Sequence, residues 1–208
     1  MLALGIDTAT GDLVVGVGKV GEGAPQLLAE SVEATRAHNE RLIPTAQAVL
    51  AQAGASFANL GAVVVGCGPG PFTGLRVGMA SASALGQALG IPVYGVVTHD
   101  ACAALIDAPS ALVVTDARRR EVYWARYEAG KRVAGPDVCA PGAIPVGSVD
   151  VLSVPEHLAE QVQVDADRVT HVSPRTLGLF AAADFSAAPA PLVAHYLRRP
   201  DAVPPKEG

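Results

Sequence analysis

A glycine-rich segment, residues 66–78, is the feature that most restricts how this chain can fold. It follows a compact β-rich run at 62–65 and leads into a stretch at 74–89 that predicts a helix. Gly90 is suited to end that helix, and residues 91–97 form another β-rich run. A strand, a helix and a second strand in this order predict a right-handed crossover between parallel strands. The sequence therefore indicates an α/β fold.

A glycine-rich loop between a strand and a helix can turn its backbone N–H groups toward a phosphate. Residues 66–74 have that position, but neither GxxxxGK[ST] nor GxGxxG fits their glycine spacing. Pro69 and Pro71 have no N–H, which reduces the number of donors. Thr73 could cap the helix, and Arg76 could offer a guanidinium group. Two interpretations follow: a tight, ordered connector, or a loop that contacts a nucleotide or a partner.

The helix predicted after the loop has one face made of small residues. Gly78, Ala82 and Gly86 are four positions apart and therefore lie on one side of a helix. Glycine inside a helix costs about 1 kcal/mol relative to alanine, so we expect another backbone to approach this face closely. Either the protein's own sheet or a helix of another subunit could occupy it.

A second helical pattern covers residues 42–53. Its apolar face comprises Leu42, Ala46, Val49, Leu50 and Ala53. Pro44 conflicts with a long straight helix because it lacks an N–H and clashes with the preceding turn. We therefore expect a helix start or a kink at Pro44.

The N-terminal part of the chain predicts three strands, at 2–6, 13–17 and 26–32. The first two are separated by a polar, threonine-rich turn that begins with Asp7 and Thr8, so they are expected to form a hairpin. Asp7 in this position could order its own turn or take part in a ligand site.

The pattern of the chain changes near residue 109. Beyond it the predicted elements are short: strands at 112–115 and 122–127, and helices at 156–161 and 175–182. We expect a first lobe of residues 1–108 and a smaller, irregular second lobe of residues 109–208. The tail at 198–208 has three prolines and is expected to be loosely ordered.

Composition excludes several classes of protein. Asp and Glu number 20 against 15 Lys and Arg, so the chain lacks the basic excess typical of proteins that bind RNA alone. The N-terminus has no basic segment of a signal peptide, and no apolar run reaches the roughly 18 residues of a membrane span, so a cytoplasmic location is expected. Cys67, Cys102 and Cys139 are far apart without a CxxC, which indicates neither a disulfide framework nor a metal site.

Four motifs in this order resemble those of the TsaB (YeaZ) family. Residues 5–10 (GIDTAT) are similar to an IDTST-type opening, and residues 38–44 (HNERLIP) to an H-x-E-x-L-[LI]-P segment. Residues 68–78 (GPGPFTGLRVG) match GPGSFTGLRIG almost throughout, with proline in place of the usual serine. Residues 116–123 (DARRREVY) are similar to DARRGEVY, with an arginine in place of glycine.

This resemblance implies a fold of the actin and sugar-kinase class (ribonuclease H-like). Such a fold has two related lobes, each with a mixed five-stranded sheet and helices, and the second lobe is reduced in TsaB-like proteins. The implied function is that of a non-catalytic subunit. It would bind and activate the paralogue TsaD, which places threonylcarbamoyl on an adenosine beside the anticodon of tRNA. The ATPase TsaE is a further implied partner, a homodimer could form in isolation, and tRNA would be met only through the complex.

TsaB-like proteins pair through helices of the first lobe, which assigns expected roles to residues here. The expected partner interface comprises Leu42, Leu50, Gly78, Ala82, Leu85 and Gly86. A loop that could contact a nucleotide or a partner comprises Asp7, Thr8, Gly68, Gly70, Thr73 and Arg76. No cofactor of its own and no metal are expected, although ATP or ADP could bind at the interface of the complex. Arg118, Arg119 and Arg120 form a local basic cluster that could contact tRNA or could simply be a solvated turn.

Two other functions stay open. A stand-alone ATPase or kinase of the actin class would use Asp7, Thr8 and Asp116 near its phosphates. A peptidase would need a nucleophile with a base, but Ser81 and Ser83 lie on a predicted helix without a G-x-S-x-G elbow. TsaD-like relatives bind a metal through HxxxH, and no two histidines here have that spacing. The five are His38, His99, His157, His171 and His195.

Overall fold

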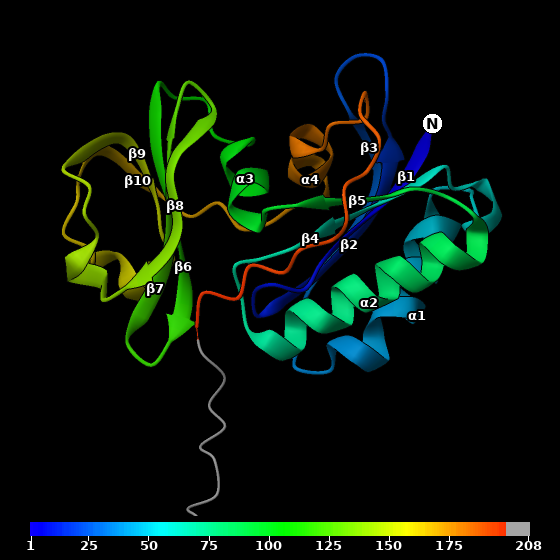
Figure 1. Cartoon of the computed structure of the whole chain (residues 1–208), viewed down its shortest axis with the longest axis horizontal. Helices are drawn as coiled ribbons and strands as arrows, with labels where there is room; N and C mark the ends of the chain where they lie inside the picture. The colour runs from blue at the N-terminus through cyan, green and yellow to red at the C-terminus, as the bar shows by residue number, and fades with distance from the viewer. Residues whose placement is uncertain (199–208) are drawn as a thin grey trace, which may run out of the picture.

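The computed structural model describes residues 1–198, which form two lobes with one five-stranded mixed sheet each (Figure 1). The first sheet has the order β3-β2-β1-β4-β5. Its strands are β1 (Leu2–Asp7), β2 (Asp12–Lys19), β3 (Gln26–Ala34), β4 (Ala62–Gly66) and β5 (Val93–Val96). β1 pairs with β2 in antiparallel fashion, and β1, β4 and β5 run parallel. The predicted hairpin and the parallel pairing after the glycine-rich segment are confirmed.

The second sheet has the order β10-β9-β6-β7-β8. Its strands are β6 (Ser110–Arg118), β7 (Glu121–Glu128), β8 (Lys131–Cys139), β9 (Ser148–Ser153) and β10 (Asp165–Thr170). β6 pairs antiparallel with β7 and parallel with β9, as β1 does with β2 and β4. The two lobes therefore repeat one topology, which confirms the two-lobe fold implied by the resemblance. Sequence patterns alone missed β8, β9 and β10.

Two long helices cover one face of the first sheet: α1 (His38–Gln52) and α2 (Phe72–Leu89). Their apolar sides pack on alternate residues of the strands, among them Ile6, Val15 and Val65, to form the largest core cluster. α1 begins six residues before Pro44, so the predicted helix start at Pro44 is wrong. Pro44 lies on the exposed side of the helix.

Two short helices lie between the sheets: α3 (Thr98–Ala103) and α4 (Thr176–Ala182) (Figure 1). They pack against each other, and α4 covers the second face of the first sheet through Leu179 and Phe180. The proposed boundary at residue 108/109 falls between α3 and β6. The chain after β10 nevertheless returns to the first sheet, so α4 and Leu192 complete the packing of the first lobe.

The second lobe keeps its strands but has only short 3₁₀ helices at the positions that α1 and α2 occupy in the first. These are η2 (Pro141–Ala143) and η3 (Glu156–Gln161), the latter at the predicted helix 156–161. A third, η1 (Phe57–Asn59), precedes β4. Within residues 1–198, no helix is long and apolar enough to cross a membrane. The tail predicted at 198–208 lies, beyond its first residue, outside the described residues.

Candidate functional site

Two of the sequence motifs, residues 5–10 and 68–78, meet at the end of β1. Asp7 is fully buried, and its carboxylate accepts hydrogen bonds from the Ala9 N–H (2.8 Å) and the Thr98 hydroxyl (2.8 Å). The Thr98 hydroxyl in turn accepts the N–H of Gly68 (3.2 Å). Burial raises the pKa of Asp7 from 3.8 to about 6, although both hydrogen bonds lower it. The Asp7 turn, the glycine-rich segment and α3 are thus joined through one buried carboxylate.

The glycine-rich segment is wrapped closely around the turn that follows β1. Thr8 donates its hydroxyl hydrogen to the Gly74 carbonyl (2.8 Å). A Cβ at Gly70 would overlap the Ala9 carbonyl, and a Cβ at Gly78 would overlap the Thr8 hydroxyl. The glycines are therefore required by contact between two segments of the same chain. This geometry matches the interpretation of the loop as a tight, ordered connector.

The same contacts limit which atoms of the Asp7 turn a nucleotide could reach in this chain alone. Asp7 and Thr8 have no exposed surface, and the backbone of Thr8 and Ala9 is covered by Gly70 and Gly74. A phosphate at Asp7, Thr8 or Ala9 would have to displace the protein's own loop, whereas Thr10, Gly11 and Asp12 at the tip of the turn are partly or fully exposed. Asp7 and Thr8 therefore do not fit a direct contact with a phosphate group.

The predicted partner interface needs correction, because most of its residues lie inside the first lobe. Leu42, Leu50 and Ala82 are almost completely buried in the core, and Gly78 and Gly86 are also buried. Gly78 packs on Thr8 and Gly86 on Val93, while Leu85 is partly buried against the same core. The small face of α2 thus faces its own sheet, and the opposite sides of α1 and α2 are exposed.

The start of α2 lies at the surface and carries an aromatic cluster. The Arg76 guanidinium lies 3.8 Å from the centroid of the Phe72 ring, and its Nε donates to the Tyr196 hydroxyl (3.4 Å). The rings of Phe72 and Tyr196 are 5.0 Å apart, and both are more than 40% exposed. Thr73 beside them is exposed as well. Arg76 and Thr73 were predicted as site residues from the sequence, whereas Tyr196, which lies 120 residues after Arg76, was not assigned to this site.

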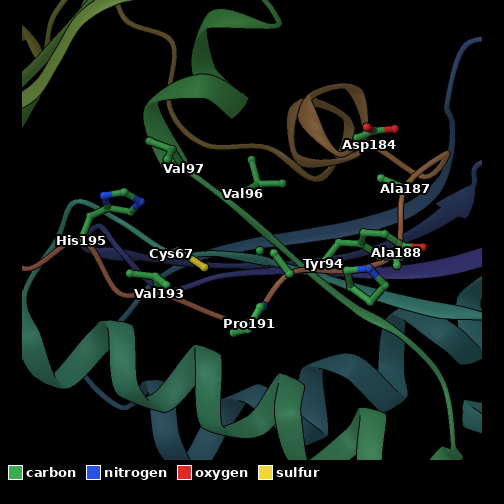
Figure 2. A pocket seen from close by; sticks show the side chains of 13 residues that line it. Cys67, Tyr94, Val96, Val97, Asp184, Ala187, Ala188, Pro191, Val193 and His195 are labelled. Atoms are coloured by element: carbon green, nitrogen blue, oxygen red, sulfur yellow. The ribbon is translucent and has the colours of Figure 1, made fainter.

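A cavity of about 320 Å³ lies between β5 and the chain segment 187–195 (Figure 2). Its walls are largely apolar, with Tyr94, Val96 and Val193 among the lining side chains. Cys67 and His195 line the same cavity. The backbone N–H of His195 donates a hydrogen bond to the backbone carbonyl of Cys67 (2.9 Å). The sequence alone does not predict that Cys67 and His195 lie in one cavity, because they are far apart in the chain.

Cys67 and His195 are the two residue types of a thiol nucleophile and its base. Burial, followed by the negative charge of Asp7, raises the pKa of Cys67 to about 11. Burial and the nearby Arg132 lower the pKa of His195. The thiol is therefore protonated at neutral pH, whereas nucleophilic catalysis needs the thiolate. This arrangement gives the peptidase interpretation no support.

The two lobes are joined through α3. Asp100 accepts a hydrogen bond from the Tyr127 hydroxyl (2.7 Å) and forms an ion pair with Arg132 (3.1 Å), both from the second sheet. The neighbouring His99 is fully buried, and its Nε2 lies 2.9 Å from the Thr115 hydroxyl. Burial, followed by the charge of Arg132, lowers the pKa of His99 to about 3, so this histidine is neutral and structural.

The three clustered arginines lie at the turn between β6 and β7, and all three are exposed. Asp116, a candidate residue for a phosphate site, accepts the backbone N–H of Arg118 (2.6 Å) and lies 3.6 Å from Nε2 of His157. In the part of the chain that the structure describes, no group of three or more His, Cys, Asp or Glu side chains is placed to hold a metal ion.

Comparisons with known proteins agree with this arrangement. Residues 31–193, well over half of the chain, match the family described as TsaD: tRNA N6-adenosine threonylcarbamoyltransferase. An uncharacterised protein of Mycobacterium tuberculosis is 51% identical over 203 residues, which cover 97% of this chain and 93% of that protein. The tRNA threonylcarbamoyladenosine biosynthesis protein TsaB of Escherichia coli is 37% identical over 97 residues, covering 45% of this chain and 42% of that protein.

Among solved structures, YeaZ from Pseudomonas aeruginosa superposes with a TM-score of 0.71. The superposition covers 87% of this chain and 89% of that chain at 24% sequence identity, which shows that the two share a fold. The family match, the order of the motifs and this fold together identify the chain as a member of the TsaD family, in its TsaB (YeaZ) branch.

Proposed function

We propose that this protein is a non-catalytic subunit that binds a TsaD-type tRNA N6-adenosine threonylcarbamoyltransferase and supports its modification of tRNA. The outer surface of the first lobe carries this proposal. Between Arg41 and Asp100 the sequence contains a single Asp, Glu, Lys or Arg, which is Arg76. That stretch includes most of α1 and all of α2, so two long surface helices are nearly free of charge.

The helices α1 and α2 contact each other. We call their exposed sides together the helix-pair face. Its α1 residues are Ile43, Pro44, Gln47, Ala48, Ala51 and Gln52, and its α2 residues are Ala80, Ser83, Ala84, Gln87 and Ala88. Solvated helices normally present a charged or strongly polar outer face. Depletion of charge is instead typical of the centre of a protein interface, and small side chains allow a partner helix to approach closely.

The choice of partner rests on family membership. A TsaD-type paralogue shares the fold and would present an equivalent pair of helices, so two helix-pair faces could pack about a pseudo-twofold axis. The relative from Escherichia coli is named as a biosynthesis protein for threonylcarbamoyladenosine, which supports tRNA modification as the setting. A second copy of this chain could use the same face when the paralogue is absent. A TsaE-type ATPase, with ATP or ADP, would then bind near the junction.

The proposal is tested by placing a charge in the helix-pair face. Ala84→Arg and Ala48→Arg are suitable because both alanines are exposed, so the fold is expected to survive. Ala143→Arg in the second lobe is the matched control, because Ala143 is also an exposed alanine. Size-exclusion chromatography with light scattering on mixtures with the cognate TsaD-type protein measures complex formation.

The wild type and Ala143→Arg are expected to form a complex of one copy each. An unpaired arginine buried in an interface costs about 3 kcal/mol or more, so each face variant should bind at least about 100-fold more weakly. Equal binding by Ala84→Arg and Ala48→Arg would rule out the helix-pair face. A wild-type protein that forms no complex would rule out the proposed function.

A further inference from the structure

The β6–β7 turn holds three consecutive arginines in a backbone conformation that side chains disfavour. β6 ends at Arg118 and β7 begins at Glu121, so Arg119 and Arg120 form a two-residue hairpin loop. Arg118, Arg119 and Arg120 have φ values of 61°, 52° and 62°. Loops with positive φ at both central residues favour Asn-Gly, because Cβ crowds the backbone in this region. Backbone strain of this kind is concentrated at ligand contacts.

The acidic side chains near this turn are already engaged. Asp116 accepts the Arg118 N–H, and Glu121 forms an ion pair with Arg198 (2.6 Å). Arg198 also donates to the Ala117 carbonyl (2.7 Å), which fixes it beside the turn. In the described residues, the guanidinium groups of Arg118 and Arg120 have no hydrogen-bond or ion-pair partner. The turn therefore carries a local excess of positive charge on a chain whose net charge is −5.

The aromatic cluster at the start of α2 is linked to this turn by the chain segment 196–198. Tyr196, which contacts Phe72 and Arg76, is two residues before Arg198, so at most about 7 Å of chain separates their backbones. Figure 1 shows the β6–β7 turn, the end of the described chain and the start of α2 on the same side of the molecule. We call this the basic–aromatic surface; it comprises Phe72, Arg76, Arg118, Arg120, Tyr196 and Arg198.

We propose that the basic–aromatic surface binds the phosphate backbone and unpaired bases of RNA. Guanidinium groups neutralise phosphates, and exposed rings stack on bases, so the combination is typical of sites for single-stranded nucleic acid. An acidic protein surface could pair with the arginines, but it would not stack on the exposed parts of the Phe72 and Tyr196 rings as unpaired bases can. RNA as the ligand rests on the proposed function, in which tRNA is the substrate of the complex.

The experiment uses the complex of this chain with its TsaD-type partner, formed and verified by light scattering before RNA is added. The probe is a transcribed tRNA with a fluorescent label, titrated at several KCl concentrations. Arg120→Gly removes the charge and fits the positive φ, whereas Arg120→Lys keeps the charge. Lys131→Gln is the control: it removes one charge at the β7–β8 turn, about 26 Å away at the other end of β7.

We expect Arg120→Gly to reduce the slope of log affinity against log salt by about one, and to weaken binding roughly threefold near 0.15 M salt. Arg120→Lys and Lys131→Gln should retain the wild-type slope. Tyr196→Leu should weaken binding without changing the slope, because stacking releases no counterions. An Arg120→Gly complex with wild-type affinity and slope would overturn the proposal.

Two further outcomes separate this inference from the proposed function. If Arg120→Gly weakens binding of the TsaD-type protein in the absence of RNA, the surface is a protein contact and the inference is wrong. If the wild type forms no complex, the proposed function fails, and the same titration on the chain alone decides the RNA inference. Weak tRNA binding that is reduced in Arg120→Gly would support the inference. Equal tRNA binding by wild type and Arg120→Gly would overturn it.

Discussion

The Thr98 hydroxyl donates a 2.8 Å hydrogen bond to the carboxylate of Asp7, 91 residues earlier in the chain. This contact joins the end of β1 to the start of α3, and the Thr98 N–H also donates to the Gly68 carbonyl (2.7 Å). Residues 5–10, residues 68–78 and the start of α3 are therefore held together by buried polar groups. Asp7, Gly68 and Thr98 have structural roles at this point.

Asp7→Asn should stabilise the protein above neutral pH. The folded state keeps the proton of Asp7 up to a pKa of about 6, against 3.8 in the unfolded chain. The contribution of Asp7 to stability is therefore largest below about pH 4 and is lost as pH rises through about 6. An asparagine, which carries no charge, should raise the free energy of unfolding at pH 8 by up to about 3 kcal/mol.

Urea denaturation at pH 5 and pH 8 measures this effect as the difference between Asp7→Asn and wild type. His99 titrates with the opposite sign, since its pKa is lowered, but it is present in both proteins and cancels in the difference. The advantage of the variant should be greater at pH 8 than at pH 5. A variant that is less stable than wild type at pH 8 would show that the Asp7 charge is stabilised by its surroundings.

Gly78→Ala should destabilise the protein, although alanine is the better helix former. The usual gain is about 1 kcal/mol, but a Cβ at Gly78 would overlap the Thr8 hydroxyl. Overpacking of a core costs about 1–3 kcal/mol, so we expect a net loss of up to about 2 kcal/mol. Thermal or urea unfolding checks this. Ser83→Ala on the exposed side of the same helix should change stability by less than about 0.5 kcal/mol.

Arg120→Gly should make the isolated protein more stable. Arg120 has a φ of 62°, where a side chain costs about 1–2 kcal/mol that glycine avoids. The greater freedom of glycine in the unfolded chain offsets about half of this gain. We expect a melting temperature about 2–4 °C above wild type, measured by calorimetry. A melting temperature below that of wild type would mean that the Arg120 side chain makes stabilising contacts in the fold.

Sequence patterns predicted the first lobe well because its elements are long or strongly apolar. The run at 62–65 and the helix pattern at 74–89 correspond to β4 and α2 within two residues. β8 and β10 were missed because they are only partly buried and carry many polar residues, so neither shows the alternation of a half-buried strand. Pro44 was expected to start or kink a helix, but α1 begins at His38 and includes Pro44, so the helix does not start there.

The functional surfaces were less predictable. The spacing of Gly78, Ala82 and Gly86 correctly predicted a face that another segment approaches closely. It could not decide between the protein's own sheet and a partner, because both require small residues, and the structure places the sheet there. Tyr196 contacts Phe72 and Arg76 because the chain after β10 returns to the first lobe. No local sequence pattern predicts the course of that segment.

The most direct test of the account is the rate of threonylcarbamoyl transfer to tRNA by the cognate TsaD-type protein, titrated with this chain. If this chain is a supporting subunit, the rate is expected to rise to a plateau at one equivalent of wild type or Ala143→Arg, and to stay low with Ala84→Arg. A TsaD-type protein with full activity on its own, or transfer catalysed by this chain alone, would contradict the assignment of a non-catalytic supporting subunit.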